Sequence, residues 1–248
     1  LKKGLEKYGA RAASAVVMDP KTGAVLALAS FPNYDPANFD KFPKESYKNP
    51  VVADAYEPGS TFKVLTMSAA IDEAVVKPDT RCDICEGPTS IGGFTIKTCN
   101  EKYFPQTTMT EAIIHSDNIG MVFASRKLGL DKFYDYLENY GLGQNTNIDL
   151  QDESSPDLRS KKGWREIDLA TASFGQGIAV TPVQMVTAVS AIANDGNLME
   201  PHIVREIKDE NSTFEIKPKV IRKVIKEETA KIVTEMMVRA VDKGEAKF

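Results

Sequence analysis

The stretch that decides the fold is residues 56–63, Tyr-Glu-Pro-Gly-Ser-Thr-Phe-Lys, together with the apolar run that follows it. Pro58 and Gly59 set a sharp entry turn. Beyond them, Phe62, Leu65 and two alanines recur at helical spacing, which predicts a helix over residues 61–74. Because few polar residues interrupt this run, we expect the helix to lie at the centre of the molecule.

The start of this helix carries an S-x-x-K pattern, formed by Ser60 and Lys63. Residues three apart on a helix share a face, so the lysine amine can reach the serine hydroxyl. A serine needs a neighbouring base to act as a nucleophile at neutral pH, and burial lowers the pKa of a lysine toward that role. The alternative is a helix-capping serine followed by a surface lysine, and the apolar surroundings of Lys63 argue against it.

A second polar cluster, Ser116–Asp117–Asn118, lies between two predicted helical segments, 110–115 and 118–128. A tight turn would point Ser116 and Asn118 the same way, with a hydroxyl able to relay a proton and an amide able to hold a carbonyl. Taken alone, the triplet favours a simpler interpretation, a helix junction in which Ser116 or Asp117 caps the following helix.

The strand signals lie toward the two ends of the chain. Two apolar runs within residues 12–30 flank turn residues 19–23 and predict a hairpin whose strands are covered on both faces or at least lie deep in a sheet. Residues 202–216 predict a second hairpin. Between them the chain is mostly helical, and residues 227–241 predict a final amphipathic helix. This segregation indicates an α+β fold rather than alternating βαβ units.

Taken together, these patterns resemble class B penicillin-binding proteins. S-x-x-K followed by S-D-N is the pairing of penicillin-recognising serine enzymes. The resemblance extends from about residue 13 to residue 241 and rests on five motifs in order, which are residues 17–36, 56–63, 116–118, 173–177 and 181–196.

The resemblance implies a penicillin-binding, serine-transpeptidase fold, in which a mostly helical subdomain accompanies a central antiparallel sheet. It also implies a D,D-transpeptidase that needs no cofactor or metal. Ser60 would be the acylated nucleophile, with its backbone N–H as one oxyanion-hole donor, and Lys63 its general base. Ser116 and Asn118 would be the proton-relay and substrate-positioning pair.

The implied partners are a peptidoglycan stem peptide ending in D-Ala-D-Ala, β-lactam antibiotics that mimic it, and a glycan-polymerising cell-wall protein. Such enzymes act on the extracytoplasmic face of the cell membrane. No apolar run here approaches the ~20 residues that cross a bilayer, so we expect any anchor to lie upstream of this chain.

The K-T-G motif of the family is missing, and the chain stops about where it should begin. We therefore expect residues 1–248 to be a partial transpeptidase domain that lacks C-terminal strands. Its expected parts are a sheet hairpin over 12–30, a mainly helical part over 60–196, and a hairpin with a final helix over 197–248. A smaller departure is Asp117, where class B enzymes often carry serine.

Two other functions stay open. A β-lactamase or a β-lactam sensor shares S-x-x-K, although S-D-N and the proline-rich approach to Ser60 favour a transpeptidase. The absent K-T-G is the one feature that favours a non-catalytic cell-wall scaffold, and truncation explains that absence more simply.

Composition and cysteines limit the remaining function classes. The 248 residues carry 31 Lys and Arg against 35 Asp and Glu, with no long basic block, which predicts no nucleic-acid partner.

The chain has three cysteines. Cys82 and Cys85 form a C-x-x-C pair, with Cys99 further on. A zinc site would need a fourth ligand from His115 or His202, so we expect structural or disulfide-capable thiols, with Cys99 able to pair with either neighbour in an oxidising compartment.

Overall fold

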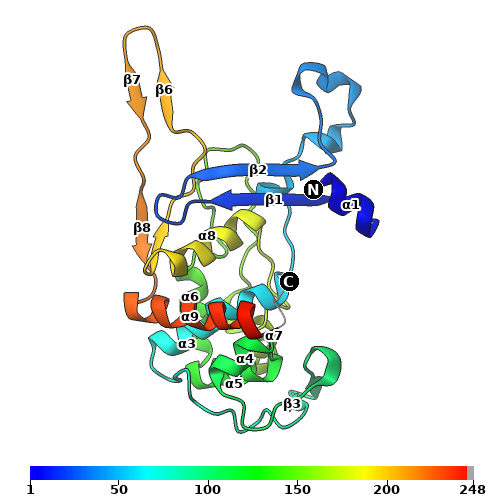
Figure 1. The fold of residues 1–248 in the computed structure, drawn as a ribbon, viewed down its shortest axis with the longest axis vertical. Coiled ribbons are helices and arrows are strands. Elements are labelled where there is room, and N and C mark those ends of the chain that lie inside the picture. The colour runs from blue at the N-terminus through cyan, green and yellow to red at the C-terminus, as the bar shows by residue number, and fades with distance from the viewer. Residues whose placement is uncertain (245–248) are drawn as a thin grey trace.

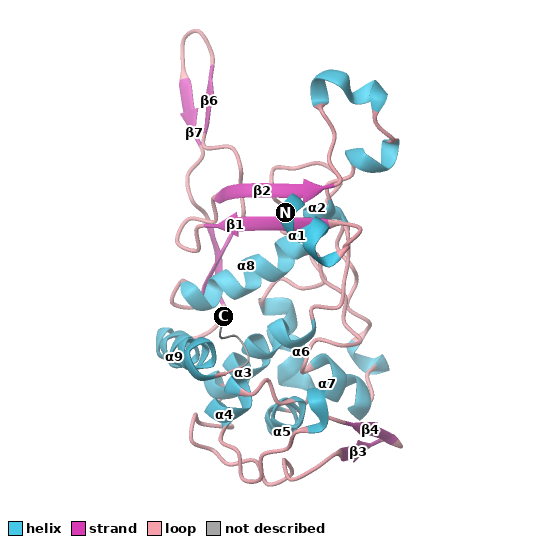
Figure 2. Cartoon of the chain, turned by 45° about the vertical axis from the view of Figure 1, so that its right-hand side comes forward, coloured by secondary structure: helices cyan, strands magenta, loops and turns pink. Residues whose placement is uncertain are grey.

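The computed structural model describes residues 1–244, except for the side chain of Asn100. Within this range a helical body lies beneath a two-stranded hairpin, and smaller hairpins project from two sides (Figure 1, Figure 2). The predicted α+β class is confirmed.

The helical body is built around α3 (Lys63–Asp72). All of its residues except Val64 are buried, as the apolar run predicts. The helices α5 (Asn118–Leu128) and α9 (Glu227–Lys243) pack against it. The body is completed by short helices: α4 (Met109–Ile114), α6 (Leu130–Asn139) and α7 (Glu166–Ala172). Two further short helices, α1 (Lys2–Tyr8) and α2 (Pro50–Ala53), lie near the hairpin.

The entry to α3 differs from the prediction by one structural detail. Residues Gly59–Phe62 form a 3-10 turn, and the α-helix begins only at Lys63. The far end comes two residues earlier than predicted, because Ala74 adopts a left-handed backbone conformation with φ 55°.

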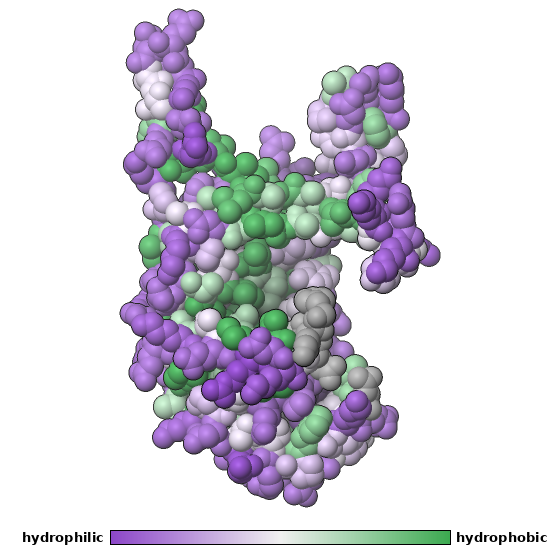
Figure 3. All heavy atoms as spheres, viewed as in Figure 1, coloured by the Kyte–Doolittle hydropathy of each residue, from purple (hydrophilic) through white to green (hydrophobic). Residues whose placement is uncertain are grey.

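The N-terminal hairpin consists of β1 (Ala13–Met18) and β2 (Val25–Phe31), paired antiparallel from Ala13 opposite Phe31. The prediction that both faces are covered is wrong for the described chain, since Val17 is 51% exposed and Leu26 is 67% exposed. The other face carries Val16, Val25 and Leu28 and packs against α8 and α2. Apolar continuity in a strand therefore does not distinguish one covered face from two. Figure 3 shows apolar surface over this hairpin.

Helix α8 (Pro182–Ala193) supports the hairpin from below and begins as its sequence predicts. The Thr181 hydroxyl accepts from the Gln184 backbone N–H, and the Gln184 side chain accepts from the Thr181 N–H at 2.9 Å. Pro182 occupies the first helical position. This reciprocal cap satisfies two backbone donors at once.

The remaining strands form three short antiparallel pairs. They are β3 (Thr89–Ile91) with β4 (Phe94–Ile96), β5 (Asn197–Met199) with β8 (Val220–Lys223), and β6 (Glu206–Lys208) with β7 (Thr213–Glu215). The last pair is the predicted C-terminal hairpin, and it projects well away from the body (Figure 1).

The three cysteines form one disulfide and leave one free thiol. Cys82 and Cys85 are both buried and form a disulfide, whereas Cys99 is unpaired and exposed. The C-x-x-C cysteines are thus the disulfide-capable pair that the sequence indicates, and Cys99 pairs with neither neighbour. Within residues 1–244 no group of three or more His, Cys, Asp or Glu side chains could hold a metal ion. Across that same range no helix combines the length and the apolar character needed to cross a membrane.

Candidate active site

The site is centred on the buried amine of Lys63, at the first residue of α3. Its side chain is only 2% exposed. The Nζ atom donates to the Ser116 carbonyl oxygen at 2.5 Å and contacts the Ser116 hydroxyl at 3.0 Å. The amine is therefore held by one residue from the turn between α4 and α5.

Burial lowers the pKa of Lys63 to about 8, and the negative fields of Asp117 and Cys99 limit the drop. An amine with that pKa is neutral in about a tenth of the molecules at pH 7, against roughly one in 2,500 for an ordinary lysine. Lys63 can thus accept a proton close to physiological pH.

Ser116 is presented by an unusual backbone conformation. Its φ is 52°, in the left-handed region, and the next N–H, that of Asp117, donates back to the Ala112 carbonyl at 2.8 Å. A non-glycine residue is rarely found there and persists only when its surroundings fix it. The two contacts with Lys63 and the packing of α4 on α5 supply that restraint.

Ser60 lies in the 3-10 turn just before α3 and is exposed. It lines a cavity of about 360 Å³ together with Lys63 and Ser116, and a smaller cavity of about 170 Å³ with Ser116, Asp117 and Cys99. The direct contact between the Lys63 amine and the Ser60 hydroxyl that the S-x-x-K spacing suggests is not formed. Both polar contacts of the amine go to Ser116 instead.

The turn that carries Ser60 is clamped by a distant segment, residues 173–177. The Gly59 N–H donates to the Gly175 carbonyl at 2.9 Å, and Glu57 accepts from the Gly177 N–H at 2.8 Å. A Cβ on Gly175 would lie 2.2 Å from the Gly59 carbonyl oxygen, so only glycine fits at this crossing. The Ser60 turn is therefore held rigidly by contacts that sequence spacing alone does not reveal.

Asp117 lies closer to the centre of this site than its position as a variable residue of the triplet suggests. It is 2% exposed, and one carboxylate oxygen caps α5 by accepting from the N–H groups of Ile119 and Gly120 at 2.7 and 3.3 Å. The other oxygen has no hydrogen-bond partner among the described residues. Burial raises the pKa of Asp117, opposed by these two bonds and by Lys63. The helix-cap interpretation of the triplet thus holds for Asp117, beside the contacts of Ser116 with Lys63.

Asn118 opens α5 on the other side of the turn. Its amide donates to the Lys97 carbonyl at 2.8 Å, and it lines a groove of about 650 Å³ that also includes Cys99, Phe174 and Gln176. The structure thus brings Ser60, Lys63 and Ser116 to one cavity and places Asn118 in the adjoining groove. Cys99 belongs to that groove and to the smaller cavity beside Ser60.

Comparison with known proteins identifies the family. The model of the penicillin binding protein transpeptidase domain matches residues 13–248. Stage V sporulation protein D of Bacillus subtilis is 36% identical over 244 residues, which cover 96% of this chain and 38% of that protein. Peptidoglycan D,D-transpeptidase FtsI of Escherichia coli K12 is 34% identical over 187 residues, 75% of this chain and 31% of that protein.

Solved structures agree with the sequence matches. Penicillin binding protein 3 of Mycobacterium tuberculosis, in complex with aztreonam, superposes with a TM-score of 0.91 and 31% identity, covering 99% of this chain and 55% of that one. The chain spans less than half the length of the curated relatives it matches. The resemblance to class B penicillin-binding proteins is confirmed, and the chain belongs to the family of penicillin-binding protein transpeptidase domains.

Proposed function

We propose that this chain carries the acyl-transfer site of a peptidoglycan D,D-transpeptidase. The observation that carries the proposal is the buried Lys63 amine, which contacts the Ser116 hydroxyl at 3.0 Å in a cavity shared with Ser60. The family match and the relatives named peptidoglycan D,D-transpeptidase support it.

In the first step the Ser60 hydroxyl attacks the carbonyl of the penultimate D-Ala of a donor stem peptide. A neutral amine has two N–H donors and one lone pair. If the Ser116 carbonyl and hydroxyl oxygens occupy the two donors of Lys63, the lone pair is left to take the Ser60 proton. The Ser60 backbone N–H supplies one donor for the oxyanion.

Breakdown of the tetrahedral intermediate releases the terminal D-Ala, whose amine leaves with a proton passed from Lys63 through the Ser116 hydroxyl. An acceptor amine from a second stem peptide then attacks the Ser60 ester, and Ser60 recovers its proton by the reverse route. The Asn118 amide holds the peptide from the adjoining groove, which Phe174 and Gln176 also line.

The proposal extends to partners and location. β-Lactams would acylate Ser60 as substrate mimics, and the relatives solved with aztreonam and ampicillin support this. A glycan-polymerising protein would supply the strands to be cross-linked. The buried Cys82–Cys85 disulfide suits an oxidising, extracytoplasmic setting.

Labelling with a fluorescent penicillin tests the proposal on the intact protein that carries this chain. We expect one label per molecule, abolished by Ser60→Ala and retained by Ser90→Ala, an exposed serine on β3. No label on the wild type, or label that survives Ser60→Ala, would refute it. Fast release of the label would instead identify a β-lactamase, because a transpeptidase keeps a long-lived acyl-enzyme.

A further inference from the structure

The groove beside the Ser60 cavity is lined by the β3–β4 hairpin and by the start of α7. Phe94 lines it from the hairpin, Arg165 lines it from the position just before α7, and Asn118 lies in the same groove. Its volume of about 650 Å³ is within the roughly 300–1,000 Å³ typical of ligand sites. The groove can therefore hold the part of a donor peptide that precedes the reacting D-Ala.

Asn118 connects this groove to the acyl-transfer site. Its side-chain amide donates to the Lys97 carbonyl, and no described residue donates to its side-chain oxygen. That oxygen can accept an N–H of a bound peptide. Because Ser116, two residues earlier, contacts the Lys63 amine, a donor held at Asn118 reaches from the reacting centre into the groove.

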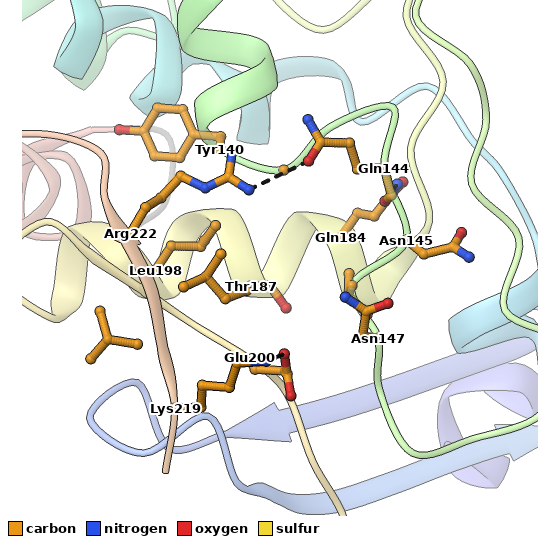
Figure 4. Close-up of a pocket in the computed structure, with 14 residues that line it drawn as sticks. Tyr140, Gln144, Asn145, Asn147, Gln184, Thr187, Leu198, Glu200, Lys219 and Arg222 are labelled. Carbon is orange, nitrogen blue, oxygen red and sulfur yellow. Dashed lines mark hydrogen bonds and ion pairs between the residues drawn. The ribbon is translucent and has the colours of Figure 1, made fainter.

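Arg165 is fixed at its base and open at its tip. Its Nε atom donates to Asp168 at 3.1 Å, and its backbone N–H donates to the same carboxylate oxygen at 2.8 Å. The side chain is 70% exposed, and its two terminal amino groups donate to no described residue. The arginine of a separate cavity of about 220 Å³ differs, since Arg222 uses both terminal nitrogens within the protein, on the Glu138 carbonyl and the Gln144 side chain (Figure 4). Arg165 thus presents two accessible, unused donors to the groove.

The charges around Arg165 favour an anionic ligand. Asp168 also accepts from Arg159 at 3.0 Å, so two guanidinium groups share one carboxylate. Hydrogen bonds from the Arg165 side chain and backbone lower the pKa of Asp168 to about 2, and the carboxylate is therefore charged at neutral pH. The other cation of the groove, Lys97, is paired with Glu101 at 2.8 Å. One positive charge is left uncompensated at the tip of Arg165.

The anions of a stem peptide are carboxylates. Ahead of the D-Ala-D-Ala end they are the α-carboxylate of a glutamate linked through its side chain and the second carboxylate of a diaminopimelate. A guanidinium binds a carboxylate through two parallel N–H donors, whereas an amide has no charge and only one acceptor oxygen. Building on the proposed transpeptidase function, we propose that Arg165 selects donor stem peptides with a free carboxylate ahead of the D-Ala-D-Ala end over the same peptides with that carboxylate amidated.

Release of D-Ala from synthetic donors by the intact protein tests the proposal. The reference donor is L-Ala-γ-D-Glu-meso-diaminopimelyl-D-Ala-D-Ala, and two others carry an amide in place of the glutamate or the diaminopimelate carboxylate. All three keep the terminal carboxylate. We expect kcat/KM to be at least about tenfold lower for one of the amidated donors, and that donor identifies the carboxylate that Arg165 contacts.

Arg165→Gln should remove this preference by lowering kcat/KM for the acid to the value for the amide, while kcat/KM for the amide stays unchanged. A merely structural role would lower all three values alike. Arg165→Lys should keep part of the preference, because it keeps the charge and loses the paired donors. Arg126→Gln is the matched control and should keep the full preference, since Arg126 pairs with Glu166, the neighbour of Arg165 in the chain, and does not line the groove.

The role of Arg165 would be overturned if the wild type released D-Ala equally from all three donors or from none, or if Arg165→Gln kept the preference. A fluorescent penicillin with an uncharged side chain should label Ser60 normally in every variant, because it lacks the carboxylate in question. Absence of label on the wild type would refute the proposed acyl transfer. Normal labelling without a preference among the donors would overturn the role of Arg165 alone.

Discussion

Helix α3 carries a buried charged side chain at each end, and the protein treats the two in opposite ways. At its last residue, Asp72 accepts from the Lys226 N–H, the Thr229 hydroxyl and the Tyr136 hydroxyl at 2.7–2.8 Å. At its first residue, Lys63 contacts Ser116 alone. Burial by itself would raise the pKa of Asp72, but the hydrogen bonds outweigh it and lower that pKa. For Lys63 burial prevails, and its pKa falls to about 8.

The difference separates a structural charge from a reactive one. Asp72 joins the end of α3 to α6 and to the start of α9, so its charge is compensated and stabilises the fold. The buried charge of Lys63 has too few partners to offset the loss of water. This lowers the free energy of unfolding but leaves an amine that changes protonation near neutral pH.

The largest expected effect comes from removing the reactive charge. Lys63→Met should lower the rate of Ser60 acylation by penicillin by about 10²–10⁴-fold, the usual contribution of a general base. The free energy of unfolding should stay equal or rise, because an apolar side chain of similar length replaces a buried amine. Stopped-flow labelling and urea unfolding measure the two quantities. A variant that kept its acylation rate would remove the role assigned to Lys63.

Removing the structural charge should lower the free energy of unfolding and leave the acylation rate nearly unchanged. Asp72→Ala leaves the Lys226 N–H and the Thr229 hydroxyl without their acceptor and leaves Tyr136 with Glu73 alone, so we expect a loss of about 2–4 kcal/mol in the free energy of unfolding. The acylation rate of the folded protein should change little. Urea unfolding followed at Trp164, the single tryptophan of this chain, measures the loss.

The neighbouring Glu73 provides the matched control for this variant. Its carboxylate accepts from Lys132 at 2.8 Å and Tyr136 at 3.1 Å but is more exposed than that of Asp72. Glu73→Ala should therefore cost no more than about 1 kcal/mol. Equal losses for the two variants would erase the distinction between Asp72 and an ordinary surface carboxylate.

The pH dependence of acylation sharpens the comparison from the reactive side. Since the protonated amine cannot accept the Ser60 proton, the acylation rate should fall about tenfold for each pH unit below 8 and level off above it. Ser116→Ala should preserve a single titration while moving its midpoint, because it removes one contact of the amine. A rate that is flat from pH 6 to 9 would contradict the assignment of Lys63 as the base.

The parts of this site that the sequence predicted are those set by local spacing. The buried helix, the Thr181 cap and the C-terminal hairpin all follow from patterns within about a dozen residues, and the structure confirms them. The same spacing placed Lys63 in an apolar environment, which is where it lies.

The rest depended on contacts between distant segments. The clamp of Gly59 on Gly175 joins residues more than a hundred positions apart. The left-handed conformation of Ser116 turns its side chain toward Lys63 while Asn118 faces another groove, and no spacing rule encodes that turn. The exposed faces of Val17 and Leu26 likewise depend on what covers the hairpin, which an apolar run does not specify.

The smallest expected effect is a difference in how stability responds to alkaline pH. The folded pKa of Lys63 is about 8, below the 10.5 of an ordinary lysine, so the unfolded chain binds more protons between those values. Stability should therefore rise with pH in that window, by roughly 1 kcal/mol per pH unit from this group, whereas below pH 8 both states are protonated and the full cost of burial remains. Measurements from pH 8 to 9.5 stay below the titration of Tyr140, whose pKa burial raises and which would reverse the slope. Lys63→Met should lack this rise when its unfolding curves are compared with those of the wild type.

Asp72, with its lowered pKa, contributes nothing to stability changes in that pH window. Its stabilisation is complete above about pH 4 and is lost only as pH falls through the folded pKa. Parallel stability curves for the wild type and Lys63→Met would mean that the amine at the start of α3 is as well compensated as the carboxylate at its end.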